Sequence, residues 1–183
     1  MKHIIITMIG IGMMLSGCIG SGENTAINNE KAGVFPEIEG IDLQGDARAL
    51  PHTFSGKLNI IAVGFEREHQ QGIDTWMSLV DELSQKYDAV KFYEVPVIYK
   101  ANAAWRGWIN NGMRMGIKDE TARERTITVY TNQEKFADIF TLDKSESAIL
   151  LLDDDARVLW KFQGAATPHA RQALVQTVMH YMQ

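Results

Sequence analysis

Apolar and polar positions alternate between strand-like and helix-like patterns from about residue 35 to the end of the 183-residue chain. Leu58–Phe65 is an apolar run rich in Ile and Val, which is typical of a central strand covered on both faces of a sheet. Apolar residues then recur at helical spacing from Ile73 to Tyr87 and predict a helix with one buried stripe. Val90–Tyr99 predicts a second strand.

A second helix is predicted from the segment that begins at Ala101, whose apolar residues again share one side. Asn110-Asn111-Gly112 predicts that this helix weakens there, because Asn and Gly are poor helix formers. The apolar side allows two interpretations. Trp105 and Trp108 could pack into the core, which is the default for such a stripe. Alternatively, Trp105 and Arg106 could bind a partner, since Trp and Arg dominate binding hot spots.

The last third of the chain predicts a strand, a helix, a hairpin and a closing helix. The β-branched run 126–131 is the strand, and Asn132 is placed to cap the helix that follows it. Two apolar runs, 148–152 and 157–162, flank an acidic turn and predict the hairpin. Thr167-Pro168 is a helix start, with a capping hydroxyl and then Pro at the first helical position. The residues expected to face inward after Asn132 are Phe136, Ile139 and Phe140.

The order of these elements predicts a single α/β domain. An opening segment broken by Gly40 and Gly45 precedes the first long strand and indicates a β-hairpin region. Strands separated by helices form a partly parallel sheet covered by helices, and the terminal hairpin adds antiparallel strands. The expected fold class is therefore α/β, with a mixed central sheet flanked by helices.

Composition and charge narrow the range of partners. Apolar residues make up 45% of the chain, which supports a buried core. The formal net charge is −5 without a visible basic stripe, which argues against a nucleic-acid partner. No apolar run reaches the roughly 18–20 residues of a membrane-spanning helix. Neither a cofactor nor a metal is expected, because the sequence lacks a phosphate-binding glycine loop, a dinucleotide fingerprint and histidines at ligand spacing.

The first residues have the pattern of a targeting segment. Residues 1–17 read as a secretory signal peptide, with Lys2 ahead of an apolar stretch and small residues after it. Leu15-Ser16-Gly17-Cys18 resembles the lipobox of bacterial lipoproteins, in which the cysteine is acylated and becomes the new N-terminus. A plain signal peptide with a chance cysteine is the alternative. The small, polar segment 18–33 is expected to be a flexible tether, and the folded domain to span 34–183.

This interpretation fixes both the location and the sulfur chemistry. The protein is expected outside the cytoplasm, held to a membrane by lipid, and on the periplasmic side of the inner or outer membrane if the host is Gram-negative. Cys18 is the single cysteine of the chain. If it carries lipid, the mature domain has no free thiol and no disulfide.

The ends of the domain resemble the thioredoxin-like fold, as found in peroxiredoxins and in the thiol oxidoreductases of cytochrome c maturation. The matching segments are "DLQGDARALPHTFSGK" before the first long strand and "LLLDDDARVLWKFQGAATPHARQAL" at the end. The resemblance implies that His69 and Gly72 stand where the two redox cysteines would be, and that Ser147 stands near the proline facing them. In those enzymes a thiolate at a helix N-terminus does the chemistry. Thiol–disulfide exchange is therefore not expected here.

A closer resemblance is to the mitochondrial ATP synthase assembly factor family, which has a thioredoxin-like fold without redox cysteines. Three segments carry it: "FPEIEGIDLQGDARALP", "WINNGMRMGI" and "LLLDDDARVLWKFQGAAT". The resemblance implies a role in helping a membrane subunit to assemble, with a membrane protein as the client. The expected function is thus a lipid-anchored, non-redox binding or assembly protein rather than an enzyme.

The turn after the first long strand keeps a second class of function open. Glu66, Arg67, Glu68 and His69 form a charged cluster at the end of a strand, where open α/β sheets bind ligands. The cluster could be a binding site, a non-thiol acid–base site that uses the Glu66–His69 turn, or merely a solvated turn. A degenerate component of a thiol-redox or cytochrome maturation system is the other alternative.

Overall fold

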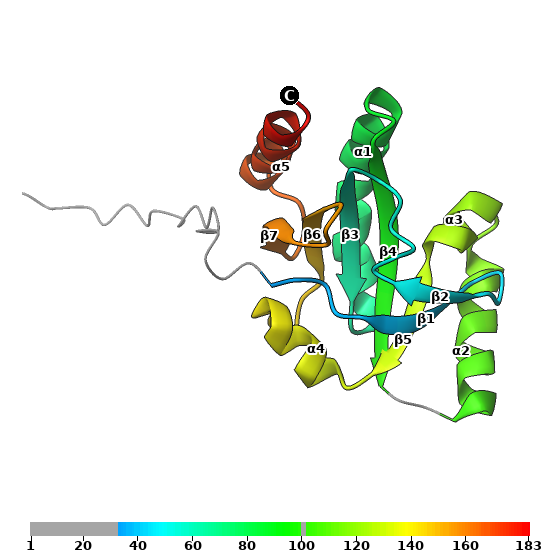
Figure 1. The fold of residues 1–183 in the computed structure, drawn as a ribbon. Coiled ribbons are helices and arrows are strands. Elements are labelled where there is room, and N and C mark those ends of the chain that lie inside the picture. The colour runs from blue at the N-terminus through cyan, green and yellow to red at the C-terminus, as the bar shows by residue number, and fades with distance from the viewer. Residues whose placement is uncertain (1–32, 100–101) are drawn as a thin grey trace, which may run out of the picture.

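The computed structural model describes residues 33–99 and 102–183, which form a seven-stranded sheet with helices on both faces (Figure 1). The strands lie in the order β2-β1-β5-β4-β3-β6-β7. Their bounds are β1 (Ile38–Asp42), β2 (Ala47–Leu50), β3 (Leu58–Gly64), β4 (Val90–Tyr99), β5 (Ile127–Thr131), β6 (Ala148–Asp153) and β7 (Val158–Gln163). The helices are the 3₁₀ turn η1 (Arg67–His69) and α1 (Gln70–Lys86), α2 (Ala103–Gly116), α3 (Glu120–Arg125), α4 (Gln133–Phe140) and α5 (Pro168–Tyr181).

Strand β3 lies inside the sheet, as its apolar run predicts. It pairs in parallel with β4, where Ile61 faces Tyr93, and antiparallel with β6, where Ile61 faces Leu150. The β4–β5 pair is also parallel, whereas β6–β7, β1–β2 and β1–β5 are antiparallel. The predicted mixed sheet, the opening hairpin and the terminal hairpin are therefore confirmed.

The side chains of β3 enter two separate cores, one on each face of the sheet. Ile60 and Ala62 pack with apolar residues of α1 and α5. Ile61 and Val63 pack with α4 and with the segment that precedes β1. Successive side chains of a strand point to opposite faces, so a strand covered on both sides must be apolar at nearly every position. This is why the sequence of β3 shows no alternation.

The predicted caps of the last two helices are present. The Asn132 side chain accepts a hydrogen bond from the Lys135 amide at 2.8 Å, and the Thr167 hydroxyl accepts one from the Ala170 amide at 3.1 Å. Each cap satisfies one of the backbone N–H groups that the first helical turn leaves without a partner. Inside α4, Phe136 and Phe140 are buried as predicted.

Helix α2 differs most from its prediction. It continues through Asn110-Asn111-Gly112 to Gly116, and the short helix α3 follows it. Trp105 and Trp108 are 54% and 69% exposed, so the core-packing interpretation of these residues is wrong. An apolar stripe marks one face of a helix without saying what covers that face, which is why spacing alone could not decide. Ile139 of α4 is likewise 40% exposed rather than inward-facing.

The predicted signal peptide (1–17), Cys18 and nearly all of the tether (18–33) lie outside the described residues. Phe35, at the start of the described domain, is buried edge-on against Phe54 and Phe136. Within residues 33–99 and 102–183, no helix is long and apolar enough to cross a membrane.

Candidate functional site

The charged turn after β3 divides into an exposed part and a buried part. Glu66, Arg67 and Glu68 are exposed, whereas His69 is buried at 8% exposure. The His69 ring folds back under the turn, where its Nδ1 accepts a hydrogen bond from the Phe65 amide at 3.2 Å. The ring therefore supplies a partner for the first backbone N–H after the strand, which ordinary sheet pairing no longer satisfies.

This contact bears directly on the acid–base alternative. Because Nδ1 of His69 accepts a hydrogen bond, the proton of the neutral ring is assigned to Nε2. The nitrogen able to take a proton is thus the one committed to the Phe65 amide, and protonation would cost that bond. The geometry favours a structural role for His69 over a role in proton transfer.

Gly72 and Ser147, which the resemblance pairs across the site, are in contact. A methyl group placed on Gly72 would come 2.8 Å from Oγ of Ser147. Ser147 is 3% exposed, so its hydroxyl has little room to move. The first turns of α1 are also tied to the loop after β7, because the Trp76 indole donates to the Gly164 carbonyl at 3.1 Å. Gly72 and the start of α1 are therefore held closely against Ser147 and the loop after β7.

A groove of about 510 Å³ lies beside this turn, at the carboxyl ends of β3 and β4. Its volume falls in the range of small-ligand and side-chain pockets. It brings together two predicted candidates, Glu66 and Trp105, whereas Arg67 and Arg106 are not among its lining residues. The lining residues are Phe65, Glu66, Ile98, Tyr99, Asn102, Trp105 and Gln133.

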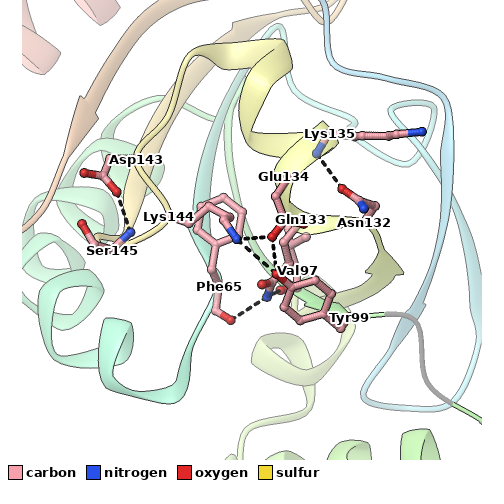
Figure 2. Close-up of polar contacts among 10 residues, drawn as sticks. All are labelled: Phe65, Val97, Tyr99, Asn132, Gln133, Glu134, Lys135, Asp143, Lys144 and Ser145. Atoms are coloured by element: carbon pink, nitrogen blue, oxygen red, sulfur yellow. Dashed lines mark hydrogen bonds and ion pairs between the residues drawn. The ribbon is translucent and has the colours of Figure 1, made fainter.

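Gln133 forms the floor of the groove, and sequence reasoning missed it. Its Nε2 donates to the carbonyls of Phe65 at 2.8 Å and of Val97 at 2.6 Å, and the residue is 6% exposed (Figure 2). The amide thereby links the carboxyl ends of β3 and β4, where the two strands part. The sequence offered one weak indication, a glutamine directly after the Asn132 cap. A polar residue there is common, because the first turn of a helix is normally exposed to water.

The rim of the groove carries a cluster of polar side chains. The Glu134 carboxylate accepts hydrogen bonds from the Tyr99 hydroxyl and, at 2.6 Å, from the Lys144 ammonium (Figure 2). These two donors, Lys144 first, lower the pKa of Glu134 from 4.5 to about 2, and the carboxylate raises the pKa of Lys144. Glu134 is therefore an ionised carboxylate paired with Lys144, and Glu66 is the acidic residue among those that line the groove.

Helix α2 forms the far wall of the groove and is attached mainly by polar contacts. The Tyr130 hydroxyl of β5 donates to Oδ1 of Asn110 at 2.9 Å, and the Arg106 guanidinium lies 4.8 Å from the centre of the Tyr130 ring. The predicted candidate Arg106 is thus directed at β5. Trp105 and Trp108 stack on each other with ring centres 5.0 Å apart.

The part of the chain that the structure describes brings no group of three or more His, Cys, Asp or Glu side chains close enough to hold a metal ion. The groove is instead lined by aromatic rings, amides and one carboxylate. Such a lining suits the binding of a side chain or a short chain segment.

Comparisons with solved structures place the domain in the thioredoxin-like class. BsSco, a member of the Sco family of cytochrome c oxidase assembly proteins, aligns with a TM-score of 0.56 at 10% identity over 82% of this chain and 95% of that chain. A DsbF homologue from Corynebacterium diphtheriae gives 0.54 at 18% identity over 84% and 89%. The exposed lipoprotein thioredoxin Etrx1 from Streptococcus pneumoniae gives 0.51 at 11% identity over 79% and 99%. The predicted thioredoxin-like fold is confirmed.

The family is shown by the sequence itself. Residues 16–180 match the model of the ATP10 protein family, and the chain belongs to that family. This confirms the resemblance to the assembly factor family. No curated protein matches the chain significantly.

The contact between Gly72 and Ser147 predicts an energetic coupling between the two positions. Gly72→Ala should cost about 1 kcal/mol more in the wild-type chain than in a Ser147→Ala chain, because the added methyl meets the hydroxyl oxygen in the former alone. Urea denaturation of the four proteins measures this double-mutant cycle.

A matched glycine provides the control for this cycle. Gly107 lies within helix α2, and a methyl group added there meets no atom within 4 Å. Gly107→Ala should therefore be neutral or stabilising, and independent of residue 147, because Ala is the better helix former. Equal costs of Gly72→Ala in both backgrounds would show that the contact is without energetic effect.

The rim cluster predicts a dependence of stability on pH. Since the pKa of Glu134 is lowered from 4.5 to about 2 in the folded chain, its contribution to stability is complete above pH 4.5 and is lost as the pH falls toward 2. The difference in unfolding free energy between wild type and Glu134→Gln should therefore shrink over that interval. Glu82→Gln, at an exposed glutamate of α1, is the control. A difference that stays constant from pH 5 to pH 2 would contradict the cluster.

Proposed function

We propose that this protein is a lipid-anchored, extracytoplasmic assembly factor that acts without thiol chemistry. In this proposal it holds a segment of a membrane-complex subunit in the groove at the ends of β3 and β4. Membership of the ATP10 protein family supports the assembly role. The observation that carries the proposal is the groove itself, which occupies the ligand-binding edge of the sheet and is lined without any sulfur-containing side chain.

The absence of redox activity rests on the cysteine inventory. Cys18 is the single cysteine of the chain, and it precedes the described domain by more than a dozen residues. Exchange with a substrate disulfide within one domain needs an attacking and a resolving thiol. His69 and Gly72, which stand at the implied positions of that pair, supply neither.

The groove chemistry indicates what kind of segment would bind. Phe65, Tyr99 and Trp105 offer aromatic surface, and the Glu66 carboxylate stands beside them. An apolar side chain next to a Lys or Arg complements this combination, because the cation would meet both a carboxylate and ring faces.

The lipid anchor is proposed on the lipobox-like sequence that ends at Cys18. Two or more acyl chains would hold the protein stably at a membrane surface. One structural neighbour, Etrx1, is itself described as a lipoprotein. Mass spectrometry of the protein isolated from its host should show a mature N-terminus at acylated Cys18, and Cys18→Ser should abolish the modification. An unmodified N-terminus at another residue would exclude the anchor.

The assembly role predicts a specific loss when the groove is altered. Deletion of the gene should lower the amount of intact ATP synthase in membranes, measured on native gels. The Glu66→Gln chain should bind its client roughly tenfold more weakly, because a charge-assisted contact is lost. Crosslinking of the client from native membranes, followed by quantitative mass spectrometry, measures this binding.

Glu68→Gln is the matched control, since Glu68 is exposed in the same turn but is not a lining residue of the groove. It should leave client capture and complex assembly unchanged. If both variants reduce capture equally, recognition does not lie in the groove. If deletion instead lowers cytochrome oxidase and spares ATP synthase, the client belongs to the cytochrome system and the proposed client is wrong.

A further inference from the structure

The outer side of helix α2 is a second surface of the molecule that the groove does not explain. None of the α2 side chains described by the structure is buried. Trp105, Trp108 and Met115 are 54%, 69% and 72% exposed, whereas Ile109 and Met113 are partly covered. Trp108 and Met115 are thus the two most exposed large apolar side chains of the described residues.

These exposed residues form a continuous stripe along the helix. Trp105, Trp108, Gly112 and Met115 follow one another at intervals of three and four residues, so they lie within an arc of about 100°. The partly covered residues, such as Asn110, lie on the other side of the helix, where Tyr130 of β5 contacts it. The exposed stripe therefore lies on a different face of α2 from the one that contacts β5.

The charge of this segment is opposite to that of the whole chain. Residues 102–118 contain Arg106, Arg114 and Lys118 and no Asp or Glu, in a chain of formal net charge −5. A helix with an apolar stripe that includes tryptophan, flanked by basic residues, is the composition of helices that lie in the membrane–water interface. Its charge complements the anionic phosphates of phospholipids.

We propose that α2 docks on the surface of an anionic phospholipid bilayer, with Trp105, Trp108 and Met115 inserted among the headgroups. The stacked indoles present apolar faces with polar N–H edges, which suits the headgroup region. The exposed basic residues Arg114 and Lys118 meet the phosphates, whereas Arg106 is directed at β5. The stripe stands on the convex surface of a helix, whereas the apolar groove that would hold a peptide lies on the inner side of Trp105.

The length of chain before the domain allows this orientation. Fourteen residues lie between Cys18 and Gly33, where the described structure begins, and an extended chain over that span reaches about 50 Å. A domain of this size has a radius of gyration of only about 15 Å. A chain held at Cys18 can therefore place α2 on the same membrane, although Gly33 is hydrogen-bonded to Val158 of the edge strand β7 and α2 contacts β5. The docking itself does not rest on the proposed function, since it needs no client.

Tryptophan fluorescence gives a direct test, because the four tryptophans of the chain are Trp76, Trp105, Trp108 and Trp160. Trp76 and Trp160 are 0% and 6% exposed, so lipid quenchers reach chiefly the two indoles of α2. The full chain is bound to vesicles of phosphatidylcholine with or without phosphatidylglycerol, in which part of the lipid carries bromine. Emission should fall by roughly a third on the anionic vesicles and less on the neutral ones.

Two matched substitutions keep the reporters and change the surface. Met115→Glu places a carboxylate in the stripe and should abolish the quenching, whereas Met179→Glu, at a methionine 46% exposed on α5, should leave it unchanged. Arg114→Gln should weaken the partition of the domain to anionic vesicles about fivefold. Circular dichroism checks that each variant is folded.

Several outcomes would overturn the proposal. Absence of quenching on anionic vesicles would show that α2 does not touch the bilayer, and equal quenching on neutral vesicles would remove the role of charge. Quenching that appears only after membrane proteins are added would show that the stripe binds a protein instead. None of these results bears on client capture by Glu66→Gln, so the two proposals fail separately.

Discussion

Phe65 leaves the sheet with both of its backbone groups buried, and the rest of the site depends on how they are satisfied. Its amide donates to Nδ1 of His69, and its carbonyl accepts from Nε2 of Gln133. A buried backbone group without a partner would cost about 1–3 kcal/mol. Both partners lie later in the sequence, one in the turn that follows directly and the other at the start of α4, 68 residues on. Together they fix where the turn, the groove and the first turn of α1 lie.

This arrangement forms a concave site of thioredoxin-like topology with no cysteine at the turn. In the redox enzymes a thiolate at the helix N-terminus is the functional group. Here His69 at the corresponding turn is used to satisfy backbone, and Gly72 leaves space that the hydroxyl of Ser147 occupies. The strands, the turn and the covering helices still create a concave edge beside Glu66 and Trp105. The concave shape and the carboxylate of Glu66 suit the binding of a chain segment, as proposed above.

Much of the fold could be predicted from the sequence, because the pattern of apolar residues shows which faces of the strands and helices must be buried. The unbroken apolar run of β3 and the stripe of α1 require cover on particular faces, and the caps Asn132 and Thr167 satisfy known backbone groups. Gln133 and Glu134 were not predicted, because their partners are a carbonyl 68 residues away and a lysine whose position depends on the loop before β6. Contacts of that kind appear only once the sheet has assembled. Whether Trp105 and Trp108 are buried was left open for a related reason. Helical periodicity shows which side chains share a face, but it does not show what packs against that face.

Trp105 is part of both the groove and the exposed stripe of α2, so the two surfaces adjoin each other. One side of the indole lines the groove, and the other side stacks on Trp108 in the outer stripe. If the stripe rests among phospholipid headgroups, the groove opens beside the membrane surface, at the height where a subunit's chain enters or leaves the bilayer. The length of chain between Cys18 and Gly33 would permit this orientation without imposing it. The orientation would come from α2, whose apolar stripe and positive charge distinguish one face of the domain from the rest.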